Sequence, residues 1–489
     1  MMNTLNNDPI AEIAKEVFAI DYLYPIQRYV ISNILENKNQ IIIFPTGGGK
    51  SLCFQLPIYF LDGLTLVVVP LLSLMEDQLR RLGELNIEAA VIKGGQTSKE
   101  RDDIIRRIKD GKIKIAYITP ESLCISHTLE QLKEINIRHL VIDEAHCIYE
   151  WGETFRPAYL ELAKAINYLD IPLISAFTAT ASEKVTLKIK EIIFDDNYVR
   201  TVIENPDRPN ISYSVIPTTS KFHTLSELIK TKEKPVVIFT RSRKRCEQVA
   251  RILRDRFPEI EVFFYHAGLN KEERKTIEKW FMKTENGILS ATTAYGMGID
   301  KRNVRLSIHL DTPMSCEAYL QESGRIGRDQ KPAESVLIYS SEDVSFAKNI
   351  SESVGRSRYK KVLAYAESVN KCRRKHLLSL LSYELKEVCI RCDYCNGSLI
   401  TKIAGREEII QFIKKNKRRF TLREVRQILA GEKTYDVITK DLDCIPGYGI
   451  ISDWNTQDIE ESIKNLIDSS EIYIPSSGFW KHRLTLRRK

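Results

Sequence analysis

The chain has 489 residues, of which 43% are hydrophobic and 28% are charged. This length exceeds what one hydrophobic core can serve, and the balance of residue types excludes a disordered or fibrous protein. No apolar stretch reaches the length of a membrane span, and the N-terminus lacks the basic and then apolar order of a signal peptide. We therefore expect a soluble, intracellular protein of several domains. Its net charge of +8 is compatible with a polyanionic partner.

Short apolar runs alternate with amphipathic stretches of helix length in the N-terminal part of the chain. Asp8 and Pro9 have the residue types of an N-cap and a first helical position. The stretch 98–110 places its isoleucines on one helical face. Continuous apolar runs indicate strands that are buried on both faces, at 41–44, 65–69, 113–118, 140–142 and 173–177. This order predicts a parallel sheet with right-handed crossovers.

A glycine-rich turn follows the first apolar run, in the segment 44–51 with the sequence Phe-Pro-Thr-Gly-Gly-Gly-Lys-Ser. Glycines let successive backbone N–H groups turn toward phosphate oxygens, and the positive end of the following helix attracts the anion. Lys50 is expected to reach the β and γ phosphates of a nucleotide, and Ser51 to coordinate Mg²⁺. Phe44 stands where the strict phosphate-loop pattern has a glycine. A simple turn before a helix is the alternative.

Asp143 and Glu144 follow directly on the apolar run 140–142. Carboxylates at the end of a buried parallel strand lie at the sheet edge where ligands bind. We expect Asp143 to hold Mg²⁺ and Glu144 to orient and polarise the water that attacks a nucleotide. The alternative is an acidic helix start, which the phosphate loop earlier in the chain argues against.

The alternation of strands and helices restarts after the segment 205–210, Asn-Pro-Asp-Arg-Pro-Asn, which is typical of an interdomain linker. Strands are expected at 236–239, 288–289, 306–310 and 336–339. In the segment 321–329, Arg325 and Arg328 are expected on one face of a helix. Two such arginines would act as arginine fingers on a transferring phosphoryl group, whereas alone they would form a solvated basic face.

Four of the ten cysteines crowd together, at Cys372, Cys389, Cys392 and Cys395. Thiolates separated by two residues on a tight turn converge on one ion, and four complete the closed tetrahedron of a structural zinc site. In a chain without a secretion signal, such a cluster favours a metal over disulfides. Free thiols and an iron–sulfur or redox role are the alternatives. A helix is expected over 373–385.

Three amphipathic helices and a β-hairpin are expected in the C-terminal part. The helices lie at 407–415, 422–429 and 458–468. Thr421 is the expected N-cap of the second helix and Gly431 its end. Strands at 472–474 and 479–486 enclose the turn 475–478. This combination is similar to a winged helix, whose basic runs 414–419 and 481–489 would contact phosphates or face solvent.

Taken in order, these motifs resemble those of a superfamily 2 helicase, and specifically of the RecQ family of ATP-dependent DNA helicases. The resemblance rests on the segments 44–57, 143–148, 151–157, 177–181, 265–269, 294–300 and 321–329. It implies an α/β fold with two tandem RecA-like parallel-sheet domains, followed by a helical zinc-binding module and a winged helix. The expected boundaries are 1–205, 206–344, 345–400 and 401–489. A short form without an additional C-terminal nucleic-acid-binding module is also expected.

The resemblance implies the roles of individual residues. ATP would be bound by Gln27, at the adenine edge, and by Tyr24, Thr46, Gly47, Gly48, Gly49, Lys50, Ser51, Asp143 and Arg328. The catalytic residues would be Lys50, Asp143, Glu144, Gln321, Arg325 and Arg328, with Arg328 as the principal finger. Coupling between the ATP and DNA sites would pass through Ser175, Thr178 and Thr180. DNA would stack on Trp151, Phe155, Arg156, Phe479 and Trp480. The alternative for Trp151 is packing in the protein core, and the alternative for Phe479 and Trp480 is that one of the two packs under the hairpin.

Two departures from the family pattern concern the sites. The family usually has an aromatic residue and an arginine upstream of Gln27, where this chain has Ile20 and Tyr24. Adenine stacking would therefore move to Tyr24 or weaken. Glu153 stands at the usual histidine position of the aromatic loop, which bears on how strongly DNA stimulates the ATPase.

The expected function is ATP- and Mg²⁺-dependent translocation 3′→5′ on single-stranded DNA with unwinding of duplexes, in repair or recombination. We expect a monomer in the bacterial cytoplasm or nucleoid, with Zn²⁺ bound. Its expected partners are single-stranded and forked DNA and a single-strand-binding protein, with no membrane partner. One alternative is an ATPase that translocates or remodels complexes without processive unwinding. The other, a non-hydrolysing winged-helix DNA-binding regulator, would not need the catalytic residues named above.

Overall fold

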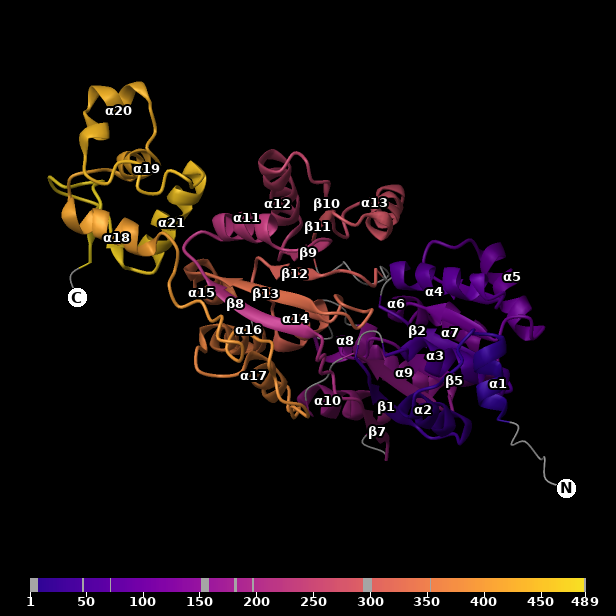
Figure 1. The fold of residues 1–489 in the computed structure, drawn as a ribbon. Helices are drawn as coiled ribbons and strands as arrows, with labels where there is room; N and C mark the ends of the chain where they lie inside the picture. The colour runs from indigo at the N-terminus through magenta and orange to yellow at the C-terminus, as the bar shows by residue number, and fades with distance from the viewer. Residues whose placement is uncertain are drawn as a thin grey trace. The chain divides into compact units, whose positions relative to one another are not determined.

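The computed structural model describes residues 8–45, 48–70, 72–150, 158–179, 183–195, 198–292, 301–351 and 353–487. The chain forms two compact units, whose elements are labelled in Figure 1. The first unit comprises Met1–Asp207 with Leu381–Tyr383, and the second comprises Arg208–Leu380 with Glu384–Lys489. Among the described residues, no helix is both long and apolar enough to cross a membrane.

The first unit is built on a seven-stranded parallel sheet with the order β3-β4-β2-β5-β6-β1-β7. Its strands are β1 (Gln40–Ile43), β2 (Leu64–Val68), β3 (Ala89–Ile92), β4 (Ile115–Ile118), β5 (Ile137–Ile142), β6 (Ile174–Thr178) and β7 (Arg200–Ile203). The five inner strands were predicted from their apolar runs. The edge strands β3 and β7 were not predicted: both are only partly buried, and β7 begins with Arg200 and Thr201, although β3 has the apolar sequence Ala-Ala-Val-Ile.

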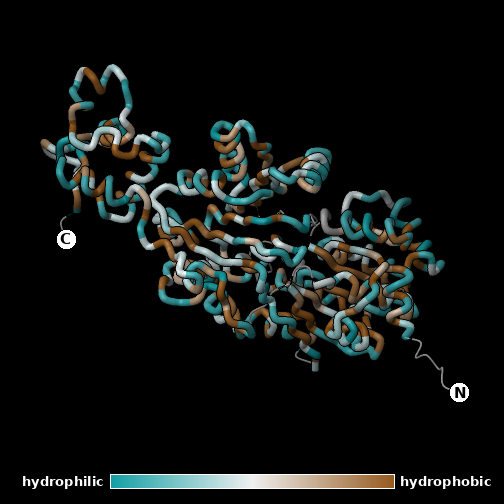
Figure 2. The backbone as a smooth tube through the Cα atoms, viewed as in Figure 1, coloured by the Kyte–Doolittle hydropathy of each residue, from teal (hydrophilic) through white to brown (hydrophobic). Residues whose placement is uncertain are grey.

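Two hydrophobic clusters lie on the two faces of this sheet. Ile41 and Ile43 of β1 belong to one cluster, and Ile42 belongs to the other, because successive strand residues point to opposite faces. Figure 2 shows the hydrophobic runs along the strands. Burial on both faces therefore explains why the inner strands are continuously apolar.

Helices cover this sheet. They are α1 (Pro9–Glu16), α2 (Pro25–Leu35), α3 (Lys50–Gln55), α4 (Leu72–Glu84), α5 (Ser98–Lys109), α6 (Pro120–Leu123), α7 (Ser126–Lys133), α8 (Cys147–Glu150), α9 (Ala158–Leu169) and α10 (Glu183–Phe194), with the 3-10 turn η1 (Leu56–Tyr59). Asp8 caps α1 as predicted, since its carboxylate accepts a hydrogen bond from Ala11 N–H at 3.3 Å. The predicted helix over 98–110 is α5.

The second unit contains a six-stranded parallel sheet with the order β10-β11-β9-β12-β13-β8. Its strands are β8 (Ile211–Pro217), β9 (Val236–Phe239), β10 (Val262–Tyr265), β11 (Ile288–Ala291), β12 (Leu306–His309) and β13 (Ala333–Tyr339). Its helices are α11 (Lys221–Thr231), α12 (Arg243–Arg256), α13 (Lys271–Lys283), α14 (Cys316–Ser323) and α15 (Ser341–Asn349). The four predicted strands are present, whereas the edge strands β8 and β10 were missed.

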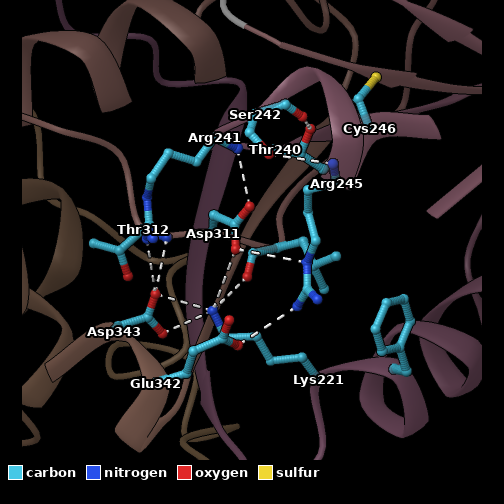
Figure 3. A network of polar contacts seen from close by, with 12 residues as sticks. Lys221, Thr240, Arg241, Ser242, Arg245, Cys246, Asp311, Thr312, Glu342 and Asp343 are labelled. Atoms are coloured by element: carbon cyan, nitrogen blue, oxygen red, sulfur yellow. Dashed lines mark hydrogen bonds and ion pairs between the residues drawn. The ribbon is translucent and has the colours of Figure 1, made fainter. Parts of the chain in front are cut away.

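A buried polar network fixes the loops that follow three strands of this sheet (Figure 3). Lys221 is fully buried, and its Nζ lies 2.8 Å from Asp343 Oδ2 and donates to Leu310 O at 2.7 Å. Asp343 also accepts the Thr312 and Ser340 N–H groups, at 3.2 and 3.0 Å. Because the buried charges are both paired and hydrogen-bonded, the network holds the carboxyl edge of the sheet in one arrangement.

Helices and a short hairpin complete the second unit. The helices are α16 (Ser353–Glu367), α17 (Arg373–Leu380), α18 (Arg406–Lys415), α19 (Leu422–Ala430), α20 (Tyr435–Thr439) and α21 (Thr456–Asp468), with the 3-10 turn η2 (Leu442–Cys444). Thr421 and Gly431 cap the two ends of α19 as predicted. The helix predicted over 373–385 ends earlier, at Leu380, because the chain turns there and Ser382 has a φ of 65°.

The predicted hairpin is shorter than expected. Its strands are β14 (Ile472–Tyr473) and β15 (Thr485–Leu486), which pair antiparallel. The second strand does not begin at Phe479, because positive φ values at Gly478 and His482 bend the chain into turns. We call the segment 474–484 between the two strands the wing.

Candidate nucleotide, metal and nucleic-acid sites

The phosphate loop is held against the start of α2. Lys50 begins α3 directly after Gly49, whose φ of 78° favours glycine. A Cβ at Gly49 would lie 2.4 Å from Gln27 Nε2, so a side chain would collide there. Gln27 Nε2 donates to Gly48 O at 2.9 Å, and its Oε1 accepts from Tyr24 N–H at 3.0 Å. The structure therefore brings the predicted adenine-reading glutamine to the loop.

Tyr24 has the exposure that stacking on a base requires. Its side chain is 61% exposed and contacts the ring of Tyr22 edge to face, with centroids 5.9 Å apart. Ile20, the other departure from the family pattern, packs against the core of the first unit instead. Two further predicted nucleotide ligands, Thr46 and Gly47, lie outside the described residues.

The two acidic residues after β5 lie beside the phosphate-loop lysine. Lys50 Nζ is 3.5 Å from Glu144 Oε1, and His146 Nδ1 is 3.3 Å from Glu144 Oε2. Glu144 has a φ of 51°, an unusual backbone conformation for a residue with a Cβ. Burial, followed by the adjacent Glu144 carboxylate, raises the pKa of Asp143 to about 6. A buried carboxylate that is unstable as a lone anion fits a divalent cation as its partner.

Ser51, the predicted magnesium ligand, has a neighbour that the sequence did not indicate. Gln78 of α4 donates its Nε2 to Ser51 Oγ at 3.0 Å. Gln55 Nε2 donates in turn to Gln78 Oε1 at 2.8 Å and to Tyr117 OH at 3.1 Å. This series of hydrogen bonds orients the hydroxyl group of Ser51. A lone glutamine on an amphipathic helix carries no signal in the sequence, so only the fold could reveal it.

The residues expected to couple the ATP and DNA sites have different surroundings. Thr178, at the end of β6, lies 3.0 Å from His146 Nδ1 through its Oγ1 and so touches the segment that carries Glu144. Ser175 instead pairs with His139 Nε2 at 3.0 Å inside the sheet, and burial lowers the pKa of that histidine to about 3. Thr180 lies outside the described residues.

The arginine pair of the second unit does not lie on a helix, contrary to prediction. Gln321 is on α14, but that helix ends at Ser323, and Arg325 and Arg328 follow in turns. Gly327, with a φ of 54°, prevents helical continuation between the two arginines. Arg325 is buried, whereas Arg328 is partly exposed. A loop therefore presents the two guanidinium groups, and they are not neighbours on a helical face.

The four clustered cysteines converge. The sulfur atoms of Cys372, Cys389, Cys392 and Cys395 all lie within 4.8 Å of one another, and those of Cys372 and Cys392 are 3.9 Å apart. Zinc–sulfur bonds of about 2.3 Å in a tetrahedron separate the sulfurs by about 3.8 Å. The arrangement therefore fits a zinc ion with four thiolate ligands and no open coordination position.

We expect Cys392→Ser to lower the expression and protease resistance of the chain, because one of four ligands is lost and metal binding contributes on the order of 10 kcal/mol to local folding. The parent should contain one zinc ion per chain by metal analysis. Cys444→Ser, at an exposed cysteine outside the cluster, is the matched control and should leave the zinc content unchanged. Iron in place of zinc, or no metal in the parent, would contradict the assignment.

The aromatic pair in the wing faces solvent. Phe479 is 88% exposed and Trp480 is 41% exposed, and their rings meet edge to face with centroids 4.8 Å apart. The alternative that one of them packs under the hairpin is therefore wrong, because they lie in a turn and not on a strand. Trp151, Phe155 and Arg156, together with Glu153, lie outside the described residues.

The two basic runs lie side by side near the wing. Arg418 N–H donates to Leu484 O at 2.9 Å, and Thr421 and Arg483 form an antiparallel bridge. Within the part of the two runs that the structure describes, which ends at residue 487, the lysine and arginine side chains are exposed: Lys414, Lys415, Lys417, Arg418, Arg419, Lys481, Arg483 and Arg487. We call this set the basic face. Cations beside exposed aromatic rings form a surface that suits a nucleic-acid backbone and its bases.

Two acidic side chains of helix α21, by contrast, contact helices of the second RecA-like sheet. Arg256 of α12 forms a bidentate pair with Asp458, at 2.7 and 2.9 Å. Glu461 accepts from Ser220 Oγ at 2.6 Å, at the start of α11. These carboxylates belong to one polar stripe of α21, and their charge would repel phosphates. The basic face therefore differs in charge from this stripe of α21.

The fold and the first site together define a nucleotide-hydrolysing enzyme with a RecA-like core. Four family models match the chain: DEAD/DEAH box helicase at 24–188, Helicase conserved C-terminal domain at 220–330, RecQ zinc-binding at 338–396 and RQC domain at 406–480. The chain is 32% identical over 480 residues to the ATP-dependent DNA helicase RecQ of Pasteurella multocida, covering 93% of this chain and 75% of that protein. The chain belongs to the RecQ family of ATP-dependent DNA helicases.

Other comparisons agree with this membership. The chain is 36% identical over 470 residues to the ATP-dependent DNA helicase hus2/rqh1 of Schizosaccharomyces pombe, covering 90% of this chain but only 35% of that protein. The helicase Lhr of Mycobacterium smegmatis, solved bound to ssDNA and AMP-PNP, shares the fold with a TM-score of 0.56 at 20% identity. That likeness covers 75% of this chain and 53% of Lhr. The cofactors of the enzyme are ATP, Mg²⁺ and Zn²⁺.

Proposed function

We propose that the chain translocates 3′→5′ along single-stranded DNA and unwinds duplexes, with ATP and Mg²⁺. The observation that carries the proposal is the placement of Lys50 beside Glu144 and His146 at the carboxyl edge of the first sheet. A phosphate-binding lysine and a water-orienting carboxylate are the parts that hydrolysis of a nucleoside triphosphate requires. The 3′→5′ direction is supported by family membership alone.

Each residue has a defined task in this proposal. Lys50 and the loop glycines bind the phosphates, Gln27 binds the adenine edge, and Tyr24 stacks on the base. Ser51 and Asp143 would hold Mg²⁺, which supplies electrostatic stabilisation of the developing negative charge. Glu144 orients the attacking water and accepts its proton. Arg325 and Arg328, with Gln321 beside them, stabilise the charge on the transferring group.

DNA would contact the basic face and the aromatic pair of the wing. The basic face would bind phosphates, and the exposed rings of Phe479 and Trp480 would stack on the last base pair of a fork. Lhr is a relative in fold that was solved with ssDNA, which favours a single strand as the track. We propose the domain boundaries 1–205, 206–344, 345–400 and 401–489 for this motor. A role in repair or recombination beside a single-strand-binding protein follows from family membership alone.

A strand-displacement assay tests the proposal. The parent chain should release the short strand of a 3′-tailed duplex with ATP, but not with a non-hydrolysable analogue and not from a 5′-tailed duplex. Displacement of streptavidin from single strands without duplex unwinding would favour a translocase. DNA binding without hydrolysis would leave only the regulator alternative.

We expect Phe479→Ala or Trp480→Ala to reduce fork unwinding while single-strand-stimulated hydrolysis and thermal stability persist. An exposed ring that stacks on the terminal base pair would stabilise the opened fork by about 1–3 kcal/mol, the magnitude of base–aromatic stacking. Tyr435→Ala, which removes an exposed ring from α20 of the same domain, is the matched control. Parental unwinding rates in both variants would assign strand separation to the motor domains.

A further inference from the structure

Arg208 lies in the segment that the sequence identifies only as a linker, yet it is bonded to the loop that carries the two arginines. It is 8% exposed. Its Nη1 donates to Gly324 O at 3.0 Å, and its Nη2 donates to Ile326 O at 3.3 Å and to Gly327 O at 2.8 Å. One guanidinium group thus binds three carbonyl groups of the loop that contains Arg325 and precedes Arg328.

Asn210 strengthens the same arrangement from two residues further on. Its Oδ1 accepts from Arg208 Nε at 3.4 Å, and its Nδ2 donates to Gly327 O at 2.8 Å and to Lys331 O at 3.0 Å. A Cβ on Gly327 would lie 2.7 Å from Asn210 Nδ2 and 2.9 Å from Ala333 Cβ. A side chain at position 327 would therefore collide with its neighbours, and the positive φ of 54° also favours glycine there.

Burial of the Arg208 guanidinium group costs free energy of folding. A buried guanidinium group is normally matched by a carboxylate, whereas this group is hydrogen-bonded chiefly to carbonyls. Burial is the main cause that lowers the pKa of Arg208; the charge of Arg328 acts in the same direction, whereas Tyr213 and Asp329 act in the opposite one.

We propose that Arg208 is a positioning residue for hydrolysis, which fixes the backbone of 324–327 so that Arg325 and Arg328 meet the γ-phosphate in one geometry. The inference rests on the proposed function, which makes these arginines the fingers. The boundary between the two compact units falls between Asp207 and Arg208. The segment that joins the units is therefore also the one that holds the finger loop.

A double-mutant cycle of Arg208→Ala with Arg328→Ala tests the proposal. Arg208→Ala should lower kcat for DNA-stimulated ATP hydrolysis by about 100-fold, the effect of misplacing a catalytic group by roughly 1 Å. The KM for ATP should change by less than about 3-fold, because binding does not depend on the fingers. In an Arg328→Ala background the same substitution should lower kcat little further, since no principal finger is left to position.

Two further variants test whether a lowered kcat merely reflects a loss of folding. Arg208→Lys keeps the charge but cannot bind three carbonyls from one planar group, so it should fold with a lowered kcat. Arg254→Ala removes an arginine of the same unit that donates to Val262 O, away from the finger loop, and should keep parental kcat. Added guanidinium ion should partly restore kcat in Arg208→Ala, which a general loss of folding would not permit.

The outcomes separate the inference from the proposed function. Parental kcat in Arg208→Ala and Arg208→Lys, beside a strongly impaired Arg328→Ala, would overturn the inference and leave the fingers in place. Equal losses from Arg208→Ala in both backgrounds would also overturn it, because the residue would then act independently of Arg328. Parental hydrolysis by Arg328→Ala would instead overturn the finger assignment itself, and the positioning role with it.

Discussion

Lys50→Ala is expected to abolish ATP hydrolysis while the chain remains folded. Lys50 is the first residue of α3, and its Nζ contacts Glu144 at 3.5 Å, so the substitution would remove the proposed phosphate contact without opening the core. Loss of one preorganised positive group from the transition state should slow turnover by at least about 10²–10³-fold. Phosphate release stimulated by single-stranded DNA measures the loss, and circular dichroism measures the fold.

The control for this variant is Lys188→Ala in the same unit. Lys188 lies on α10, where it pairs with Glu191 on the surface, and its removal should leave turnover unchanged. Retention of near-parental turnover in Lys50→Ala would contradict the nucleotide-site assignment. A variant that hydrolyses nothing and also melts early would point to a structural role for the Lys50–Glu144 contact.

The sequence predicted those parts of the fold that depend on local pattern. The inner strands were found because burial on both faces demands continuous apolar residues, as at Ile41–Ile43. The edge strand β8 has alternating apolar and polar residues, a period-two pattern that fits a half-buried strand, and it was missed because the prediction rested on continuous apolar runs. The phosphate loop and the acidic pair were found because their chemistry is confined to a few consecutive residues.

The remaining site features depend on tertiary partners. Gln78 contacts Ser51 only because α4 brings it there, and Arg208 contacts the loop at Gly324–Gly327 only because the chain before β8 is folded against that loop. Because its neighbours in the sequence are prolines and polar residues, Arg208 was predicted to belong to a linker. Arg325 and Arg328 were placed on a helix because their spacing fits one, whereas the positive φ at Gly327 decides otherwise. The sequence alone does not show whether a glycine between two arginines adopts a positive φ.

Arg328→Ala is expected to bind ATP normally and to hydrolyse it at least about 10³-fold more slowly, the magnitude of an arginine finger. The reason is that a finger acts where negative charge develops in the transition state, not in the ground state that binding measures. A fluorescent nucleotide titration gives the affinity, and single-turnover hydrolysis on saturating single-stranded DNA gives the rate. Arg328→Lys should recover little, because a point charge cannot replace a planar group with several donors.

The partial exposure of Arg328 makes this variant more informative than Arg325→Ala, which would also remove a buried side chain from the core of the second unit. Arg251→Ala, at an exposed arginine of α12, controls for the loss of positive charge and should leave both affinity and rate unchanged. If nucleotide affinity falls in Arg328→Ala while the rate from the bound state is preserved, Arg328 is a ground-state ligand. The finger assignment would then be wrong, and with it the role of Arg208 in positioning a finger for hydrolysis.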